Sequence, residues 1–411
     1  MNNSQLLIIG HVWPEPNSTA AGSRMLQLIE LLVEENFSVV FASAAQKTPH
    51  SFDLTQLGVN EASIQLNDHS FQEFVKDVAP SFVIYDRFLT EEQFGWRVRE
   101  AYPESVQILD TEDLHFLRKA REKAFKKEGN LSQVNLYSLD AKREIGAMMR
   151  CDLNLIISSV EYKLLLNKFQ FSEEQLFYLP FLVNIENEKS NPSFNERKNV
   201  VSIGNFLHAP NWDQVLYLKT SIWPLVRKKN KEIELHIYGA YSSEKVQQLH
   251  QPKEGFLVKG RAKDAQKCIQ NYRLLLAPLR FGAGLKGKII DAFSTETLVI
   301  TSSIGAEGMQ NESEWPGSIT DDPNEFAKHL LYLYSNEGEW DLASKRTKKL
   351  LIENFSKKNY AKSFVERISS LQSNLSEHRK RFFMGQVLQH QLVNAQKFMS
   401  LWIEAKTKMM K

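Results

Sequence analysis

The sequence is poor in cysteine: its 411 residues include only Cys151 and Cys268, which lie far apart and without metal-ligand spacing. Two such cysteines exclude a disulfide framework and are typical of a reducing compartment. An excess of charge of one sign is also missing, because 51 Lys and Arg stand against 49 Asp and Glu, a net charge of +2. No global field therefore predicts binding of nucleic acid or of an acidic partner.

Long hydrophobic runs are absent as well. The longest, such as LLLAPL at 274–279, have the length of a strand, so we expect no segment that spans a bilayer. The N-terminal MNNSQLLIIGHVWPEPNS has no basic n-region, and its apolar run is too short for a signal peptide. We expect a cytoplasmic protein, with peripheral contact to the inner face of the cell membrane as its closest approach to lipid.

The chain does contain short apolar runs that alternate with amphipathic stretches, a pattern typical of parallel α/β architecture. Met25, Leu28, Ile29 and Leu32 share one helical face. The basic region 117–150 indicates two helices outside the sheet. Strands are predicted in the first half at 5–12, 38–43, 81–87, 105–111 and 152–159.

A polar stretch at 184–199 divides the chain, and the alternation restarts after it. No repeat of fixed period occurs, so we expect two doubly wound, Rossmann-like domains in series, at 1–185 and 186–373, with a cleft between them. Ligands of such sheets bind outside the carboxyl ends of the strands. Strands are predicted in the second half at 200–206, 233–239, 255–260, 273–279, 297–303 and 317–321.

The tail from Ser376 to Lys411 lacks strand patterns and holds seven Lys or Arg against two Glu. Its apolar side chains recur at helical spacing: Leu388, Leu392, Ala395 and Met399. Two interpretations remain open. The tail is a packing helix with a solvated basic face, or it attaches to an anionic membrane surface or a lipid-linked acceptor.

The stretch RFGAGLKGKIIDA, 280–292, places three glycines and two lysines at a strand-to-helix corner. Gly282 and Gly284 allow backbone N–H groups to converge on an anion, and a helix that begins near Lys286 adds its orphan donors and positive dipole end. Lys286 and Lys288 add two formal charges. Asp291, one helical turn after Lys288, suits ribose hydroxyls. These parts predict a clamp for a nucleoside diphosphate.

Two other interpretations fit parts of this corner. One is a tight turn with surface lysines. The other is a P-loop, because GAGLKGK at 282–288 satisfies G-x-x-x-x-G-K, but Ile289 stands where a Ser or Thr hydroxyl should hold Mg²⁺. The missing hydroxyl argues against a P-loop NTPase.

Residues 277–309, APLRFGAGLKGKIIDAFSTETLVITSSIGAEGM, resemble the donor-binding signature of the GT-B fold glycosyltransferases in the large retaining group called family 4. SIGNFLHAPNWDQV at 202–215 is similar to the first loop of that family's second domain. WPEPNSTAAGSRM at 13–25 looks like its glycine-containing loop after strand one, and ILDTEDLHFLR at 108–118 also matches this branch. The resemblance covers most of the chain and is strongest at 200–310.

The resemblance implies roles for residues on both sides of the cleft. Asp291 takes the ribose, Lys286 and Lys288 the diphosphate, and the last helix, at about 374–411, returns to the first domain. The upstream acidic residue of the family's pair is absent here. The expected donor-binding residues are Gly22, Gly204, Asn205, Phe206, His208, Gly239, Arg261, Gly282, Ala283, Gly284, Asp291 and Glu307.

In a retaining transfer of this kind the leaving diphosphate can accept the acceptor's proton, so orientation and charge stabilisation carry the catalysis. We expect Lys286 and Lys288 to stabilise the departing diphosphate, His115 to hydrogen-bond the donor sugar, and Asp110 with Asp113 to orient an acceptor hydroxyl. No metal or other cofactor is expected. Asn211 is interpreted as a helix cap.

The resemblance therefore implies transfer of a sugar from a UDP-, GDP- or ADP-linked donor to a glycan or lipid-linked acceptor, as in cell-envelope polysaccharide synthesis. Two alternatives stay open. A GT-B epimerase or hydrolase would turn over donor without an acceptor, and a catalytically silent nucleotide-sugar-binding partner subunit would bind the donor without cleaving it.

Overall fold

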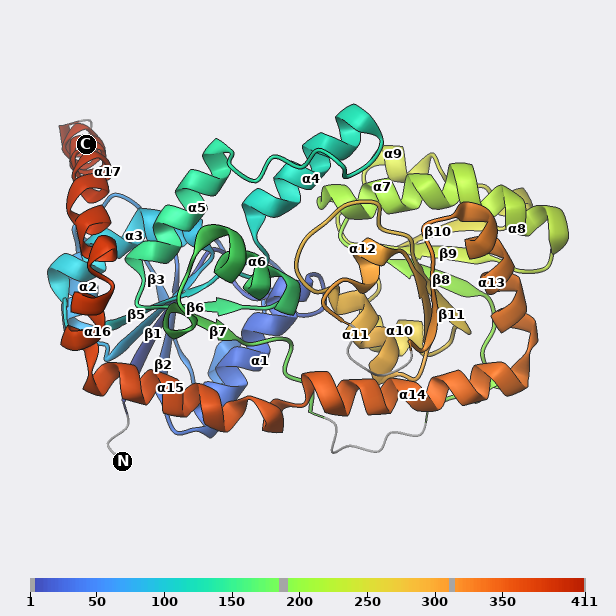
Figure 1. Cartoon of the computed structure of the whole chain (residues 1–411), viewed down its shortest axis with the longest axis horizontal. Coiled ribbons are helices and arrows are strands. Elements are labelled where there is room, and N and C mark those ends of the chain that lie inside the picture. The colour runs from blue at the N-terminus through green and yellow to red at the C-terminus, as the bar shows by residue number, and fades with distance from the viewer. Residues whose placement is uncertain (1–3, 185–190, 310–314, 410–411) are drawn as a thin grey trace.

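Two parallel sheets, each covered by helices on both faces, form the molecule (Figure 1). The computed structural model describes residues 4–184, 191–309 and 315–409. Part of the predicted boundary, residues 185–190, lies outside the described residues. The predicted α/β class, with two Rossmann-like doubly wound domains, is confirmed.

The first sheet has seven strands in the order β3-β2-β1-β4-β5-β6-β7, all parallel. The five strands predicted in this half are confirmed as β1, β2, β4, β5 and β6. The sequence pattern missed β3 and β7, because both are short edge strands and NEAS in β3 has no apolar alternation. The strand bounds are β1 Gln5–Gly10, β2 Ser38–Ser43, β3 Asn60–Ser63, β4 Phe82–Asp86, β5 Val106–Asp110, β6 Leu153–Ile156 and β7 Leu176–Tyr178.

Helices bury both faces of this sheet in two apolar clusters. In α1, Met25, Leu28, Ile29 and Leu32 are buried, as their spacing predicts. The two helices predicted within 117–150 are confirmed as α4 and α5, outside the sheet (Figure 1). The helix bounds are α1 Ala20–Glu34, α2 Ser70–Val78, α3 Phe88–Ala101, α4 His115–Glu128, α5 Leu139–Arg150 and α6 Ser159–Phe169.

The second sheet repeats the same plan with six parallel strands in the order β10-β9-β8-β11-β12-β13. All six strands predicted from the sequence are present, since runs such as LLLA are buried on both faces and read as continuous apolar segments. The strand bounds are β8 Val200–Ile203, β9 Leu235–Tyr238, β10 Phe256–Gly260, β11 Leu274–Ala277, β12 Leu298–Thr301 and β13 Gly317–Ile319.

The helices of the second domain likewise cover both faces of its sheet. Helix α11 begins directly after the lysine that the sequence placed at the helix start. The helix bounds are α7 Ala209–Tyr217, α8 Trp223–Lys229, α9 Glu244–Gln247, α10 Ala265–Ile269, α11 Gly287–Ser294, α12 Ser303–Ala306, α13 Pro323–Ser335 and α14 Glu337–Phe355.

The last helices lead back to the first domain (Figure 1). Helix α15 (Ala361–Ser373) contributes Phe364, Ile368 and Leu371 to the first-domain core, so the return begins before residue 374. Helices α16 (Leu375–Arg381) and α17 (Phe383–Met409) follow, and α17 packs against α3 and α5.

Two of the apolar side chains predicted to pack α17 do not lie on its buried side. Ala395 and Met399 are exposed and Leu388 is half-buried, while the side chain of Leu392 lies outside the described residues. The packing prediction is therefore wrong for Ala395 and Met399. Among the described helices, none combines the length and the apolar content needed to cross a membrane.

Candidate functional site

A cavity of about 1010 Å³ lies between the two sheets, at the carboxyl ends of their strands. In both sheets the strand order reverses beside the first strand, at β1/β4 and at β8/β11, and such switch points form the ligand crevice of open α/β sheets. The lining comes chiefly from residues within 16–23, 203–211 and 279–291. The cavity thus lies where the sequence predicted the cleft.

The corner between β11 and α11 forms one wall and approaches the first domain closely. Gly284 has φ +61°, and a Cβ there would lie 2.7 Å from the Cβ of Asp113. A Cβ on Gly287 would lie 2.6 Å from the Cβ of Ala20 at the start of α1. Glycine is required at both positions, because a larger residue would push the two domains apart.

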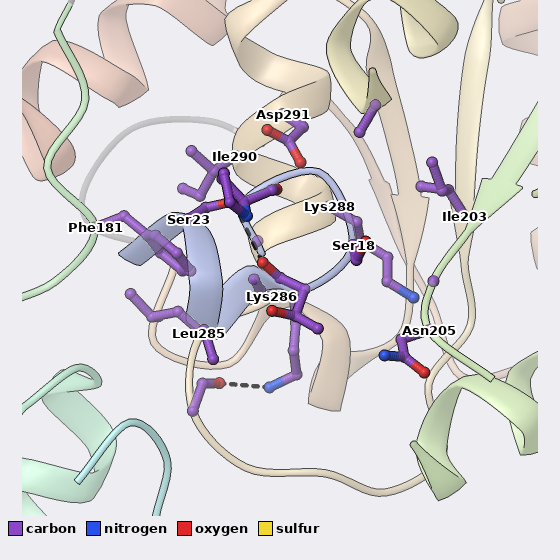
Figure 2. A pocket seen from close by; sticks show the side chains of 18 of the residues that line it. Ser18, Ser23, Phe181, Ile203, Asn205, Leu285, Lys286, Lys288, Ile290 and Asp291 are labelled. Carbon is purple, nitrogen blue, oxygen red and sulfur yellow. Dashed lines mark hydrogen bonds between the residues drawn. The ribbon is translucent and has the colours of Figure 1, made fainter. Parts of the chain in front are cut away.

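The two lysines of this corner diverge (Figure 2). Lys286 Nζ turns back to its own loop and donates to the carbonyl oxygens of Ala283 (3.1 Å) and Gly284 (2.5 Å). Lys288 Nζ donates to the amide oxygens of Asn211 (2.7 Å) and Gln214 (3.0 Å). Only Lys288 is directed toward the loop after β8, so the predicted pair does not share one target.

Lys288 is a half-buried cation whose hydrogen-bond partners are neutral amide groups. Burial, with a smaller effect of the Lys286 charge, lowers its pKa to about 7. Among the described residues no carboxylate lies within ion-pair distance of its ammonium group, whereas many buried cations of the chain have one. A partly desolvated charge without an opposite charge is unfavourable, so this position is suited to an anion.

The loop between β8 and α7 forms the adjoining wall. Gly204, Asn205 and His208 line the cavity, and burial lowers the pKa of His208 to about 4, so its imidazole is neutral at pH 7. His208, and not Asn211, is the N-cap of α7, so the predicted cap role of Asn211 is wrong. Asn211 instead joins the loop to Lys288, because its Nδ2 donates to the Asn205 carbonyl at 2.9 Å.

Asp291 lies on α11, further along the cavity (Figure 2). Burial raises its pKa to about 6, although a hydrogen bond from Gln266 Nε2, at 3.0 Å, opposes the shift. Arg261 closes the same region and donates from Nη2 to Ser18 Oγ of the first domain, at 3.0 Å. Gly239 also lines the cavity, where a Cβ would collide with Phe206.

The first-domain wall carries His115 and Asp113, just beyond β5. Burial lowers the pKa of His115 to about 4, so this imidazole is neutral at pH 7. Burial alone would raise the pKa of Asp113, but the Arg118 guanidinium, whose Nε lies 2.6 Å from Oδ2, holds it well below its usual range. Glu144 fixes the start of α4 by accepting from the backbone N–H groups of His115 and Phe116.

Four residues proposed from the sequence do not line the cavity. Asp110 is fully buried and pairs with Arg24 at 2.8 Å, so its predicted role in orienting an acceptor is wrong. Gly22 faces the backbone of Glu15, to which a Cβ would come within 2.6 Å. Phe206 packs on the second-domain core.

Glu307 is the fourth. Its carboxylate pairs in a fork with Arg121 of α4, at 2.6 and 2.7 Å, and Arg121 also donates to the Gly282 carbonyl at 2.8 Å. The predicted contact of Glu307 with the donor is replaced by a clamp between the domains. Gly282, Ala283, Lys286 and the remaining predicted donor residues do line the cavity.

Sequence reasoning missed charged residues of the first domain at this wall and behind it, among them Glu161, Glu112 and Arg87. Glu161 of α6 accepts from the N–H of Gly284 at 2.7 Å, and burial raises its pKa to about 8. Glu112 and Arg87 line the cavity at the ends of β5 and β4 with φ values of +60° and +71°. Left-handed backbone at non-glycine residues just beyond strand ends is a structural signal of a functional site that composition does not carry.

No group of three or more His, Cys, Asp or Glu side chains is placed to hold a metal ion in the described part of the chain. The acidic stretches 110–113 and 320–322 are instead engaged with neighbouring residues, as in the Asp113–Arg118 pair and in Asp321, which accepts from the backbone N–H of Ser303.

Comparison with known proteins agrees with this geometry. Residues 197–336, which contain both second-domain loops of the cavity, match the family model "Glycosyl transferases group 1". A Klebsiella pneumoniae protein described as "Uncharacterized 44.6 kDa protein in cps region" is 26% identical over 145 residues. That alignment spans 34% of this chain and 37% of the Klebsiella protein.

Solved structures share the fold at low identity. Sucrose-phosphate synthase from Thermosynechococcus elongatus has a TM-score of 0.67 at 12% identity, over 90% of this chain and 99% of that chain. HepE from Anabaena, solved with UDP-glucose, has a TM-score of 0.67 at 11% identity, over 89% and 99%. TarM from S. aureus, solved with UDP, has a TM-score of 0.56 at 16% identity, over 72% of this chain and 58% of that chain.

The family match covers the diphosphate corner, and the structural likeness extends over both sheets. The resemblance inferred from residues 277–309 is confirmed. The chain therefore has the GT-B fold, and its residues 197–336 match the model of the glycosyl transferases group 1.

Proposed function

We propose that this chain is a glycosyltransferase that moves a sugar from a nucleoside-diphosphate sugar to a hydroxyl of a glycan or lipid-linked acceptor, without a metal and with retention. The observation that carries the proposal is Lys288, a half-buried lysine held by two amide oxygens where the Gly204–His208 loop meets the start of α11. HepE and TarM, which share the fold, were solved with UDP-glucose and UDP.

The diphosphate would bind between the start of α7 and the start of α11. Lys288 supplies a positive charge, and the first N–H groups of α11 supply donors, because the N-cap residue Lys286 provides no side-chain cap. Lys286 acts mainly by holding the Ala283 and Gly284 carbonyls of its loop. The N–H of Gly284 is bonded to Glu161 and is not offered to the diphosphate. The role of Lys286 thus differs from that of Lys288.

The nucleoside would extend toward Asp291. Above its pKa of about 6 this carboxylate is ionised and accepts hydrogen bonds from ribose hydroxyls. Arg261 and Gly239 border the same part of the cavity and suit the base. The nucleotide is UDP, GDP or ADP in this proposal.

The acceptor would approach from the first-domain wall. Neutral His115 can donate or accept a hydrogen bond, and Asp113, kept ionised by Arg118, can accept one from a sugar hydroxyl. In the transfer, the bond from the sugar's anomeric carbon to the diphosphate oxygen breaks and a bond to the acceptor oxygen forms on the same face. The acceptor's proton passes to the departing diphosphate, whose charge Lys288 stabilises.

The test is nucleotide binding followed by donor turnover. We expect UDP, GDP or ADP at millimolar concentration to raise the melting temperature, and one matching nucleotide sugar to lose its sugar when an acceptor is present. No stabilisation by any of the three would contradict the proposal. Donor cleavage that is equally fast without acceptor would identify a hydrolase or epimerase, and binding without any turnover across a full acceptor panel a silent subunit.

A further inference from the structure

Helix α17 turns an apolar stripe toward solvent. Phe398, Trp402 and Met409 are 65%, 59% and 86% exposed. Their spacing places them on one side of the helix, because residues three, four and seven apart share a face. We call this set the outward stripe; its members are Met384, Ala395, Phe398, Met399, Trp402, Ala405 and Met409, all exposed.

The opposite side of the same helix is polar and is bonded to the first domain. Ser400 Oγ and Glu404 Oε2 both accept from Arg97 Nη2, each at 3.2 Å, and Ser400 also donates to Asn67 Oδ1 at 2.7 Å. Gln389 Nε2 donates to the Arg150 carbonyl at 2.8 Å.

These bonds fix the rotation of α17. A surface helix of a globular protein normally buries its apolar side and exposes its polar side, and α17 does the reverse. Seven exposed apolar side chains on one helix mark an interaction surface rather than chance exposure.

The charge around this helix is one-sided. The tail 376–411 has seven Lys or Arg against two Glu, and 117–150, which includes α5 and most of α4, has nine against four Asp or Glu. Together they carry a formal net charge of +10. Seven of their basic side chains pair with acids outside the two segments, which leaves an excess of +3; these are Arg118, Arg121, Arg143, Arg150, Arg379, Arg381 and Lys397. Helix α5 packs against both α4 and α17, and in Figure 1 it lies between α17 at the far end of the first domain and α4, which reaches toward the second domain. The excess that remains is positive and suits an anionic surface.

The two acidic residues of the tail do not weaken this match. Glu404 faces the domain, where it contacts Arg97, and Glu377 pairs with Lys380. The outward side carries Lys406, whose ammonium group lies 5.2 Å from the centre of the Trp402 ring. A Trp beside a Lys is suited to the boundary between lipid headgroups and acyl chains, since the ring enters the boundary while the ammonium stays with the phosphates.

We infer that the outward stripe of α17 docks on an anionic lipid membrane, with the helix axis in the membrane plane. This docking is independent of the proposed transferase activity, because it uses no residue of the cavity. It would hold the first domain, and with it the acceptor side of the cavity, at the membrane surface.

A second copy of the chain fits the same surface less well. Side-by-side parallel copies of α17 would bring Lys406 and Lys408 of both together. An antiparallel pair would place them against the basic start of the tail, 379–381. Like charges in such contacts are destabilising, and no exposed acidic residue of α17 is available to compensate.

The experiment is co-sedimentation of the full chain with vesicles of phosphatidylcholine alone or mixed with phosphatidylglycerol. We expect binding to the mixed vesicles and little to the neutral ones. The double variant Phe398→Ser/Trp402→Ser should bind the mixed vesicles about tenfold more weakly or worse, since both side chains leave the lipid boundary. The matched control is Leu342→Ser, an equally exposed apolar residue on α14 of the second domain.

Folding and oligomeric state are checked on the same samples. Both variants should keep the wild-type melting temperature, because the altered side chains are exposed. Equal vesicle binding by wild type and the double variant, or no binding by wild type, would overturn the inference. A wild-type dimer that the double variant converts to a monomer, without vesicle binding by either, would assign the stripe to a second copy.

Discussion

Asp110 and Lys288 are two charges near the carboxyl ends of parallel strands, the first fully buried and the second half-buried, and they differ in what surrounds them. Asp110 lies against the Arg24 guanidinium, which also donates to the carbonyl oxygens of Leu179 and Pro180. Lys288 has only amide oxygens. A charge that is paired with an opposite charge stabilises the fold. A charge whose hydrogen-bond partners are all neutral is available to a ligand.

Breaking the Arg24–Asp110 pair should give the largest effect. Arg24→Met would leave a fully buried carboxylate without its cation, which costs about 3–5 kcal/mol of unfolding free energy. Chemical denaturation measures this loss. Where the variant remains folded, its affinity for the stabilising nucleotide should match that of wild type. A loss of nucleotide affinity at unchanged stability would instead show that Asp110 takes part in nucleotide binding.

The protonation of Lys288 should make diphosphate binding depend on pH. In the free protein its pKa is about 7, and a bound diphosphate raises it, so binding takes up a proton above pH 7. Affinity should therefore be highest between about pH 6, above which Asp291 is ionised, and pH 7, and should fall as pH rises further, by up to about tenfold per unit. Calorimetric titrations from pH 7 to 9 measure this slope.

The same titrations with Lys288→Met provide the control. This variant should show a clearly shallower profile over that range, and the slope that remains is that of Glu161, whose pKa of about 8 lies in the range and which accepts from the Gly284 N–H. A slope equal to that of wild type would assign the pH dependence to another group.

The clamp between Arg121 and Glu307 should have a smaller effect. Both side chains are partly exposed, so Arg121→Ala is expected to weaken nucleotide binding by about 1 kcal/mol or less, through a looser Gly282 loop. A double variant with Glu307→Gln should bind no more weakly than Arg121→Ala alone. Loss of binding in Glu307→Gln, with Arg121→Ala unaffected, would show that Glu307 contacts the donor after all.

The sequence predicted the fold well because its strands are continuous apolar runs and its helices have a clear period. LLLA in β11 and the α1 face need no tertiary information. The corner after β11 was also predictable, since glycines and lysines before a helix have a defined chemistry. Edge strands such as β3 were not predicted, because their side chains are polar and pack little.

The site could be predicted where one continuous segment forms it. It could not be predicted where residues far apart in the sequence come together. The sequence does not reveal that Arg24 reaches Asp110, 86 positions away, or that Arg121 reaches Glu307, 186 positions away. Both acids were therefore assigned to ligand binding when their partners are arginines. The reversed α17 has the same origin, because helical spacing identifies a stripe and not the side that faces the domain.

The most direct test of the central claim compares a nucleoside diphosphate with its nucleoside, by calorimetry at pH 7, for wild type and Lys288→Met. The control variant is Lys228→Met, at an exposed lysine on α8. We expect Lys288→Met to weaken the diphosphate by about tenfold or more, as the loss of a charge-assisted contact implies, and to leave the nucleoside nearly unchanged. Equal losses for both ligands, or none for either, would contradict the assignment of this corner to a diphosphate.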